Sequence, residues 1–146
     1  MNKLQVYISG ALTGISNPEK VKKFYESIGL LCEERGLKSY IPHLNTDPIK
    51  NADITPDRVF KTDKHMVEIS DLVVAYLGCP SLGVGMELAY AESKNIPLIL
   101  LYEKEKNISR FPRGIPTVFA EIKFKNFSDA IAQLNIILEQ WKLKQY

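Results

Sequence analysis

Two continuous apolar runs constrain the fold of this 146-residue chain more than any other feature. They span residues 71–77 and 96–102, and neither shows the apolar and polar alternation of a strand with one solvated face. Such runs are typical of strands that helices cover on both faces, as in parallel sheets. Parallel neighbours need long crossover connections, which are usually helices. We therefore expect strands and helices to alternate along the chain.

The remaining segments fit this alternation. Apolar positions alternate from Leu4 to Ile8 and lead into the glycine-containing stretch 10–14, which indicates a strand that feeds a tight turn. Two further strands are expected at residues 39–41 and 117–124. Capping signals and helical spacing predict four helices. The first starts at the capping box of residues 16–19 and runs to Gly36. The second starts at Thr55, the third follows Gly85, and the fourth starts at Ser128.

This order predicts one α/β domain over residues 1–146, a three-layer sandwich with about five mostly parallel strands. The simplest strand order is 2-1-3-4-5, as in flavodoxin-like and Rossmann-like folds. In that order the first and third strands lie side by side while their helices leave to opposite faces. Ligands bind in the crevice at such a switch point. The loops at residues 10–14 and 78–85 are therefore expected to meet at one site.

Composition narrows the class of protein. The net charge is only +2, and no dense basic stretch suggests a nucleic-acid partner. No segment approaches the roughly 20 apolar residues that a membrane span needs, so we expect a soluble, cytoplasmic protein. Cys32 and Cys79 stand far apart, with no CxxC pair or cysteine and histidine cluster, and two buried thiols are the simplest interpretation. We expect no metal and no organic cofactor.

The stretch PSLGVGMELAYAE, residues 80–92, carries the first chemical signal. A strand that passes through Ser81, Gly83 and Gly85 into a helix points free N–H groups and the positive end of the helix dipole at the loop, which suits a phosphate. The loop matches neither a Walker A motif nor GxGxxG. The alternative is that the glycines only permit a tight turn. Glu87 is predicted in the first helical turn, where the helix dipole favours an ionised carboxylate. The alternative to a chemical role is that Glu87 only complements this dipole.

A second carboxylate gives Glu87 a chemical context. Asp63 precedes it by 24 residues and lies on the otherwise apolar stripe of the preceding predicted helix. Two carboxylates in different environments can divide the work of nucleophile and acid or base. The alternative is an ion pair between Asp63 and Lys61 or Lys64.

Three segments resemble the nucleoside 2-deoxyribosyltransferase superfamily, most closely its 2'-deoxynucleoside 5'-monophosphate N-hydrolase branch. They are VYISGALTG, VFKTDKHMVEISDLVVAYL and PSLGVGMELAYAESKNIPLILL, within residues 4–114. The resemblance implies an N-glycosidase of a (deoxy)nucleoside 5'-monophosphate that needs no cofactor. It makes Glu87 the nucleophile at the anomeric carbon, Asp63 the proton donor to the departing base, and Tyr7 the tyrosine near the nucleophile.

The same resemblance assigns a phosphate site. It makes Ser81, Gly83 and Gly85 the cradle of the 5'-phosphate, and makes Ser109 a phosphate-binding serine that the family supplies from the second subunit of a homodimer. The transferases of the superfamily have an acidic residue near position 81, so the neutral Ser81 favours a monophosphate. Arg113 or Arg110 is the candidate to balance the negative charge, with solvated surface charge as the alternative.

The sugar and base pocket is less defined. Gly10, Ala11 and Leu12 are expected at its edge, although Ala11, Leu12 and Thr13 replace a Ser-Ile-Arg found in members of the hydrolase branch. His43 and Asn45 follow the second strand and are candidates to contact the base, with ordinary surface positions as the alternative. Two rival functions stay open: a nucleoside 2-deoxyribosyltransferase, and a nucleotide-binding module without catalysis.

Overall fold

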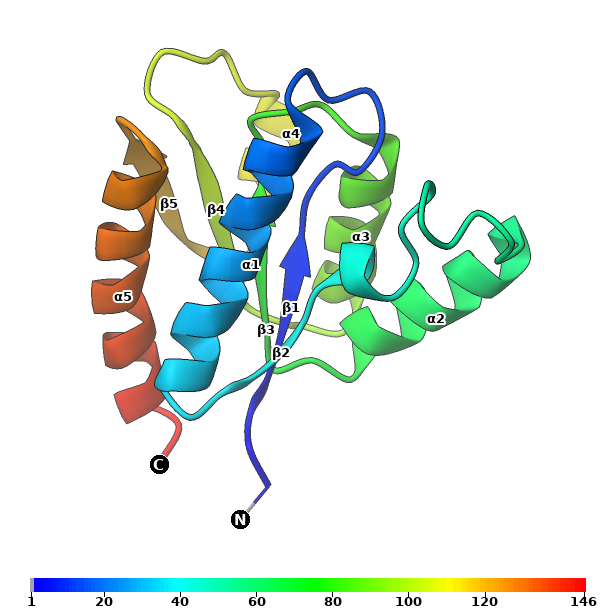
Figure 1. Cartoon of the computed structure of the whole chain (residues 1–146). Helices are drawn as coiled ribbons and strands as arrows, with labels where there is room; N and C mark the ends of the chain where they lie inside the picture. The colour runs from blue at the N-terminus through cyan, green and yellow to red at the C-terminus, as the bar shows by residue number, and fades with distance from the viewer. Residues whose placement is uncertain (1) are drawn as a thin grey trace.

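The sheet has five strands, all parallel, in the order β2-β1-β3-β4-β5. This computed structural model describes residues 2–146 (Figure 1). The strands are β1 (Gln5–Ser9), β2 (Lys38–Tyr40), β3 (Leu72–Tyr76), β4 (Leu98–Glu103) and β5 (Val118–Phe124). The predicted α/β fold, with the order 2-1-3-4-5, is confirmed.

Helices cover both faces of the sheet, which is why β1 and β3 are buried at every position (Figure 1). The long helices α1 and α5 lie on one face, and α2 and α3 pack together on the other. The bounds are α1 (Pro18–Glu34), a 3-10 turn η1 (Pro42–Leu44), α2 (Pro56–Glu68), α3 (Leu82–Ser93), a short α4 (Arg110–Arg113) and α5 (Phe127–Leu143).

Alternate residues of β1 enter two separate apolar cores. Val6 and Ile8 pack with α1 and α5, whereas Tyr7 packs with Val67 of α2 and Leu88 of α3. Side chains two residues apart on a strand point to the same face. The face that holds Tyr7 therefore also holds Ser9, and both point toward the side of the sheet where α2 and α3 lie.

Two predicted helix starts need correction, whereas α1 starts within the predicted residues 16–19. Asn17 directly precedes α1, although its side chain makes no capping hydrogen bond. Asn126 rather than Ser128 caps α5, because its side chain accepts from the N–H of Asp129 at 2.8 Å. The second correction matters more: α3 begins at Leu82, so Gly83 and Gly85 are helical and Glu87 lies past the first turn. Ser81 starts this helix early by accepting from the N–H of Val84 at 3.2 Å.

Gly10 ends β1 where the backbone passes directly against an aromatic ring. A β-carbon at this position would overlap the ring of Tyr25, which is buried in α1. The hydroxyl of Tyr25 donates to the carbonyl of Ala11 at 3.0 Å and so fixes the loop that follows. The missing side chain at position 10 allows this loop to lie against α1.

We predict that Gly10→Ala lowers the free energy of unfolding by about 1–3 kcal/mol, because the added methyl group displaces a fully packed ring. Gly114→Ala is the matched control: an added methyl there meets only ordinary contacts of 3.6 and 3.7 Å. Urea denaturation of both variants measures the effect. Equal stability of the two variants would contradict the prediction.

Candidate active site

A cavity of about 580 Å³ opens above the carboxyl ends of β1 and β3, at the predicted switch point. The loop after β1, the segment between η1 and α2, and the helices α2 and α3 form its walls. Six of the residues singled out from the sequence line this cavity: Gly10, Leu12, Asp63, Ser81, Gly83 and Glu87. The structure thus brings both candidate carboxylates and part of the predicted phosphate cradle into one space.

Glu87 lies on α3 and receives two hydroxyl donors from β1. Ser9 donates to Oε1 at 2.8 Å, and the hydroxyl of Tyr7 donates to Oε2. The carboxylate stays partly open to the cavity, with protein around the rest of it. Burial raises the pKa of Glu87 to about 7, although the bonds from Tyr7 and Ser9 act to lower it. The charge of Asp63 raises it further.

This pKa differs from the expectation that the helix dipole favours an ionised Glu87. Because the carboxyl group lies beyond the first turn of α3, the dipole acts weakly on it. Desolvation dominates instead. The result is a carboxyl group that gains or loses its proton near neutral pH.

Asp63 reaches the cavity from α2 and also receives hydroxyl donors. Tyr40 donates to Oδ1 at 3.2 Å, and the hydroxyl of Thr46 lies 3.2 Å from each carboxylate oxygen. Burial raises the pKa of Asp63, against the lowering effect of these two bonds. Within residues 2–146, Asp63 forms no ion pair with a lysine, and the ammonium of Lys64 lies over an aromatic ring instead.

Two stacked tyrosines connect these carboxylates. The rings of Tyr7 and Tyr40 lie 5.5 Å apart with an interplanar angle of 25°. One hydroxyl binds Glu87 and the other binds Asp63. Burial is the main cause that raises the pKa of both phenols, and the nearby carboxylates raise it further. Both tyrosines therefore act as neutral hydrogen-bond donors.

Sequence reasoning missed three of these four donors. It singled out none of Tyr40, Ser9 and Thr46 as a partner of the carboxylates. The position of Ser9, two residues after Tyr7 on a predicted strand, was a usable signal, because such residues share a face. The position of Thr46, in an irregular segment, carried no comparable signal.

The predicted phosphate residues divide between two hollows. Ser81 and Gly83 line the cavity that holds Glu87, at the start of the twelve-residue helix α3. Gly85 and Ser109 line a second groove, of about 830 Å³, together with α4. Arg113 lines neither hollow: its Nε donates to Oε1 of Glu121 at 2.6 Å.

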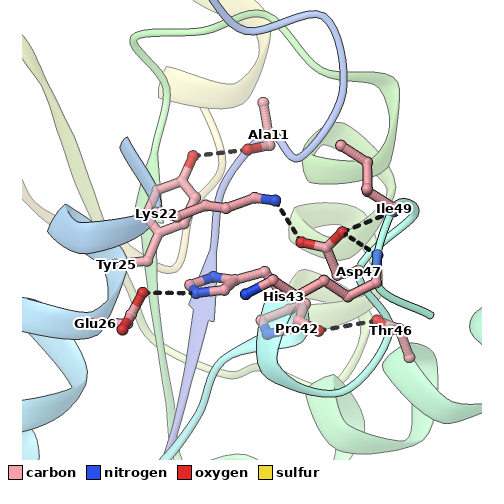
Figure 2. Close-up of polar contacts among 10 residues, drawn as sticks. Ala11, Lys22, Tyr25, Glu26, Pro42, His43, Thr46, Asp47 and Ile49 are labelled. Atoms are coloured by element: carbon pink, nitrogen blue, oxygen red, sulfur yellow. Dashed lines mark hydrogen bonds and ion pairs between the residues drawn. The ribbon is translucent and has the colours of Figure 1, made fainter. Parts of the chain in front are cut away.

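Three residues expected at the sugar and base pocket do not line it. His43 is buried, with Nε2 3.0 Å from Oε2 of Glu26 in α1 (Figure 2). Asn45 donates from its side chain to the carbonyl of Ile41 at 3.1 Å. Ala11 is buried, and its backbone carbonyl accepts a hydrogen bond from the hydroxyl of Tyr25 (Figure 2).

Residues 2–146 contain neither a metal-binding cluster nor a membrane-spanning helix. No three or more His, Cys, Asp or Glu side chains gather there in an arrangement that could bind a metal ion. No helix in that range combines the length and the apolar character needed to cross a membrane.

We predict that the carboxyl group of Glu87 titrates near pH 7 rather than near its ordinary value of 4.5. Tyr7→Phe removes a donor to the charged form, so the pKa should rise by roughly one to two units. Carbon NMR of protein labelled at the glutamate carboxyl carbons measures both values, and Glu87→Gln assigns the signal. A Glu87 that titrates near 4.5, or a pKa that falls in Tyr7→Phe, would contradict this account.

Comparison with known proteins identifies a relative that matches nearly the whole chain. The chain is 31% identical over 140 residues to a candidate 2'-deoxynucleoside 5'-phosphate N-hydrolase 1 of Thermofilum pendens, covering 92% of this chain and 95% of that protein. No profile of a known family matches the sequence.

Solved structures share the fold. CMP N-glycosidase BcmB of Clostridium botulinum superposes with a TM-score of 0.71 at 24% identity, over 91% of this chain and 98% of that one. A 2-deoxyribosyltransferase of Bacillus psychrosaccharolyticus gives a TM-score of 0.63 at 16% identity, over 87% and 90% of the two chains. With a relative matched over nearly its whole length, the chain belongs to the 2'-deoxynucleoside 5'-phosphate N-hydrolase family.

Proposed function

We propose that this protein hydrolyses the N-glycosidic bond of a nucleoside 5'-monophosphate, giving free base and sugar 5-phosphate. One observation carries the proposal: two carboxylates on different helices, Glu87 and Asp63, share one cavity, and each receives two hydroxyl donors. The family of the chain supports the same reaction. A deoxyribonucleotide is the favoured substrate, because the Thermofilum pendens relative bears that name.

The proposed reaction has two steps. The carboxylate of Glu87 attacks the anomeric carbon, the bond from that carbon to the base breaks, and its electron pair leaves with the base. Asp63 gives its proton to the departing base. Water then attacks the anomeric carbon of the glycosyl ester and loses a proton to Asp63, which frees Glu87 and retains the configuration.

The first step requires a charged Glu87 as nucleophile and a protonated Asp63 as acid. Burial raises the pKa of Asp63, which favours its protonated form. Burial and the negative charge of Asp63 raise the pKa of Glu87 to about 7, so a charged Asp63 favours the proton on Glu87. Glu87 must therefore lose its proton, and Asp63 must hold one, before the attack.

The proposed phosphate site lies at the start of α3. Ser81 and Gly83 line the cavity there, where the free N–H groups and the helix dipole favour an anion. A carboxylate about 5 Å from a phosphate would cost about 3 kcal/mol per pair of charges at an effective dielectric constant of about 20. The neutral side chain of Ser81 avoids that cost, which supports a monophosphate rather than a free nucleoside.

We further propose a homodimer. Ser109 lines the second groove and not the cavity of Glu87, so its implied contact with phosphate would have to be made in the site of another subunit. Leu82 and Phe111 are large apolar side chains that are each 92% exposed, and the interface of a dimer would cover them. Phe111 lines the same groove as Ser109.

The function is tested with a panel of deoxyribonucleoside and ribonucleoside 5'-monophosphates, with free base measured by chromatography. We expect base release, and Glu87→Ala should reduce the rate by about 10³-fold or more, because the nucleophile is lost. Glu105→Ala, at an exposed position that does not line the cavity, is the control.

Three outcomes would reject the proposal. If Glu87→Ala keeps its rate, Glu87 is not the nucleophile. If a second free base added to the assay yields a new nucleoside 5'-monophosphate that carries this base, the protein is a transferase rather than a hydrolase. If a nucleotide binds in calorimetry and stays intact for hours, the protein is a binding module.

The dimer is tested by light scattering after size exclusion. We expect the wild-type protein to be a dimer, and Phe111→Glu to be a monomer with reduced hydrolysis, because a charge at an apolar interface opposes association. Leu143→Glu, at another exposed apolar residue, is the matched control and should stay dimeric. A monomeric wild type, or a dimeric Phe111→Glu variant, would overturn the proposal.

A further inference from the structure

One wall of the active-site cavity has no regular secondary structure to hold it. We call residues 45–54 the wall segment. It follows η1, precedes α2 and contributes Thr46, Pro48, Asn51, Ala52 and Ile54 to the cavity lining. Its backbone bonds are local: Asn45 and Thr46 donate to the carbonyl of Pro42 in η1, and Asn51 N–H donates to the carbonyl of Asp47 at 2.8 Å. These bonds join only the first residues of the segment to η1, so a contact from outside must fix the rest.

Asp47 provides that fixed point. Its side chain is completely buried, and Oδ1 accepts from the N–H groups of Ile49 at 2.7 Å and Lys50 at 3.1 Å. Oδ2 accepts from the ammonium of Lys22, which reaches across from α1 (Figure 2). One oxygen thus closes the turn of the wall segment, and the other ties that turn to a long helix. Neither Asp47 nor Lys22 lines the cavity.

The ion pair between Lys22 and Asp47 is one of two polar connections between the wall segment and the α-helices and strands, among the described residues. Across residues 2–146, the hydrogen bonds and ion pairs that join the wall segment to an α-helix or a strand are Lys22 to Asp47 and Thr46 to Asp63. Burial acts to raise the pKa of Asp47, but the bonds from Lys22, Ile49 and Lys50 lower it to about 2. The side chain of Asp47 is therefore charged at neutral pH.

The wall segment lies where the base of a nucleotide would be. The proposed phosphate site is at the start of α3, and the sugar would lie over Glu87. The proton donor Asp63 must reach the departing base, and Asp63 is bonded to Thr46 of the wall segment. Pro48, Ala52 and Ile54 add apolar surface of the kind that packs on a base.

We propose that the ion pair between Lys22 and Asp47 is a positioning device for the base: it fixes the wall segment and so sets the affinity for the base half of the nucleotide without touching it. This inference rests on the proposed function. Lys22 and Asp47 are positioning residues, and the phosphate half of the site should not depend on them.

A substitution of Asp47 can remove the ion pair with Lys22 and keep the hydrogen bonds that close the turn. Asp47→Asn keeps Oδ1, which closes the turn, and replaces Oδ2 by an NH₂ group that cannot accept from Lys22. Lys22→Met keeps the apolar stem but leaves a buried carboxylate without its counter-charge. The double variant removes both charges, so its loss should be smaller than the sum of the single losses. Lys22→Arg keeps the charge and should stay close to the wild type.

The experiment compares KM for the hydrolysed nucleotide with the inhibition constant of the sugar 5-phosphate product. We expect KM to rise by about 10- to 100-fold in Lys22→Met and Asp47→Asn, the range for one charged hydrogen bond. The inhibition constant should not change, because the product lacks a base. Amide hydrogen exchange should quicken in residues 45–54 and not in the sheet. Glu139→Gln, which removes an exposed ion pair with Arg35, is the control.

The outcomes separate the inference from the function on which it rests. If the wild type releases no base from any nucleotide, the proposed function fails and the inference fails with it. If the wild type is active and KM is unchanged in both single variants, only the inference fails. If KM and the inhibition constant rise together, or exchange quickens throughout the sheet, the ion pair supports the whole fold and the inference is overturned. If neither single variant folds while Lys22→Arg does, the ion pair likewise supports the whole fold and the inference is overturned.

Discussion

The parallel pairing of β1 with β3 is the constraint on which the rest of this structure depends. Tyr7 lies opposite Val73 and Ser9 opposite Ala75 in that pairing, and the side chains of Tyr7 and Ser9 both reach Glu87. A shift of one residue in β1 would turn Tyr7 and Ser9 toward α1, because neighbouring side chains of a strand face opposite ways. Both donors to Glu87 would then be lost. The register of two buried strands thus determines the hydrogen bonds of a carboxylate on a helix.

A carboxylate that is largely surrounded by protein is unfavourable unless it is bonded, and the chain meets this demand with neutral hydroxyls instead of cations. Lysine or arginine beside Glu87 would lower its pKa and leave it a weak nucleophile tied in an ion pair. Tyr7 and Ser9 support the charge only in part, and the pKa stays near 7. The same arrangement recurs at Asp63 with Tyr40 and Thr46. Hydroxyl donors keep both groups able to exchange protons.

The sequence allowed the fold to be predicted because the relevant signals are local. Continuous apolar runs, separated by helical periodicity, are enough to indicate a parallel sheet and its switch point. The start of α3 was predicted too late, since the glycines at 83 and 85 suggested a loop, whereas the cap at Ser81 begins the helix before them. Helix ends depend on single side-chain bonds, such as the one made by Asn126, and these are poorly fixed by pattern.

Within the site, the resemblance to a family identified the two carboxylates, but their partners needed the structure. Thr46 reaches Asp63 only because an irregular segment folds back over α2, and no periodicity encodes such a path. His43 was expected at the cavity because it follows β2. Its ring instead fills a space beside Tyr25, with centroids 6.1 Å apart, where burial is more favourable than exposure at the rim. The assigned roles of all these residues remain predictions.

The helix α3 has a further consequence that follows from its two glycines. Gly83 borders the cavity of Glu87, and Gly85, only two residues along, borders the groove beside α4. A substitution that tilts or rotates this helix would alter both hollows at once. The evolution of the two hollows is therefore coupled: a substitution in α3 that suits one hollow must also be compatible with the other.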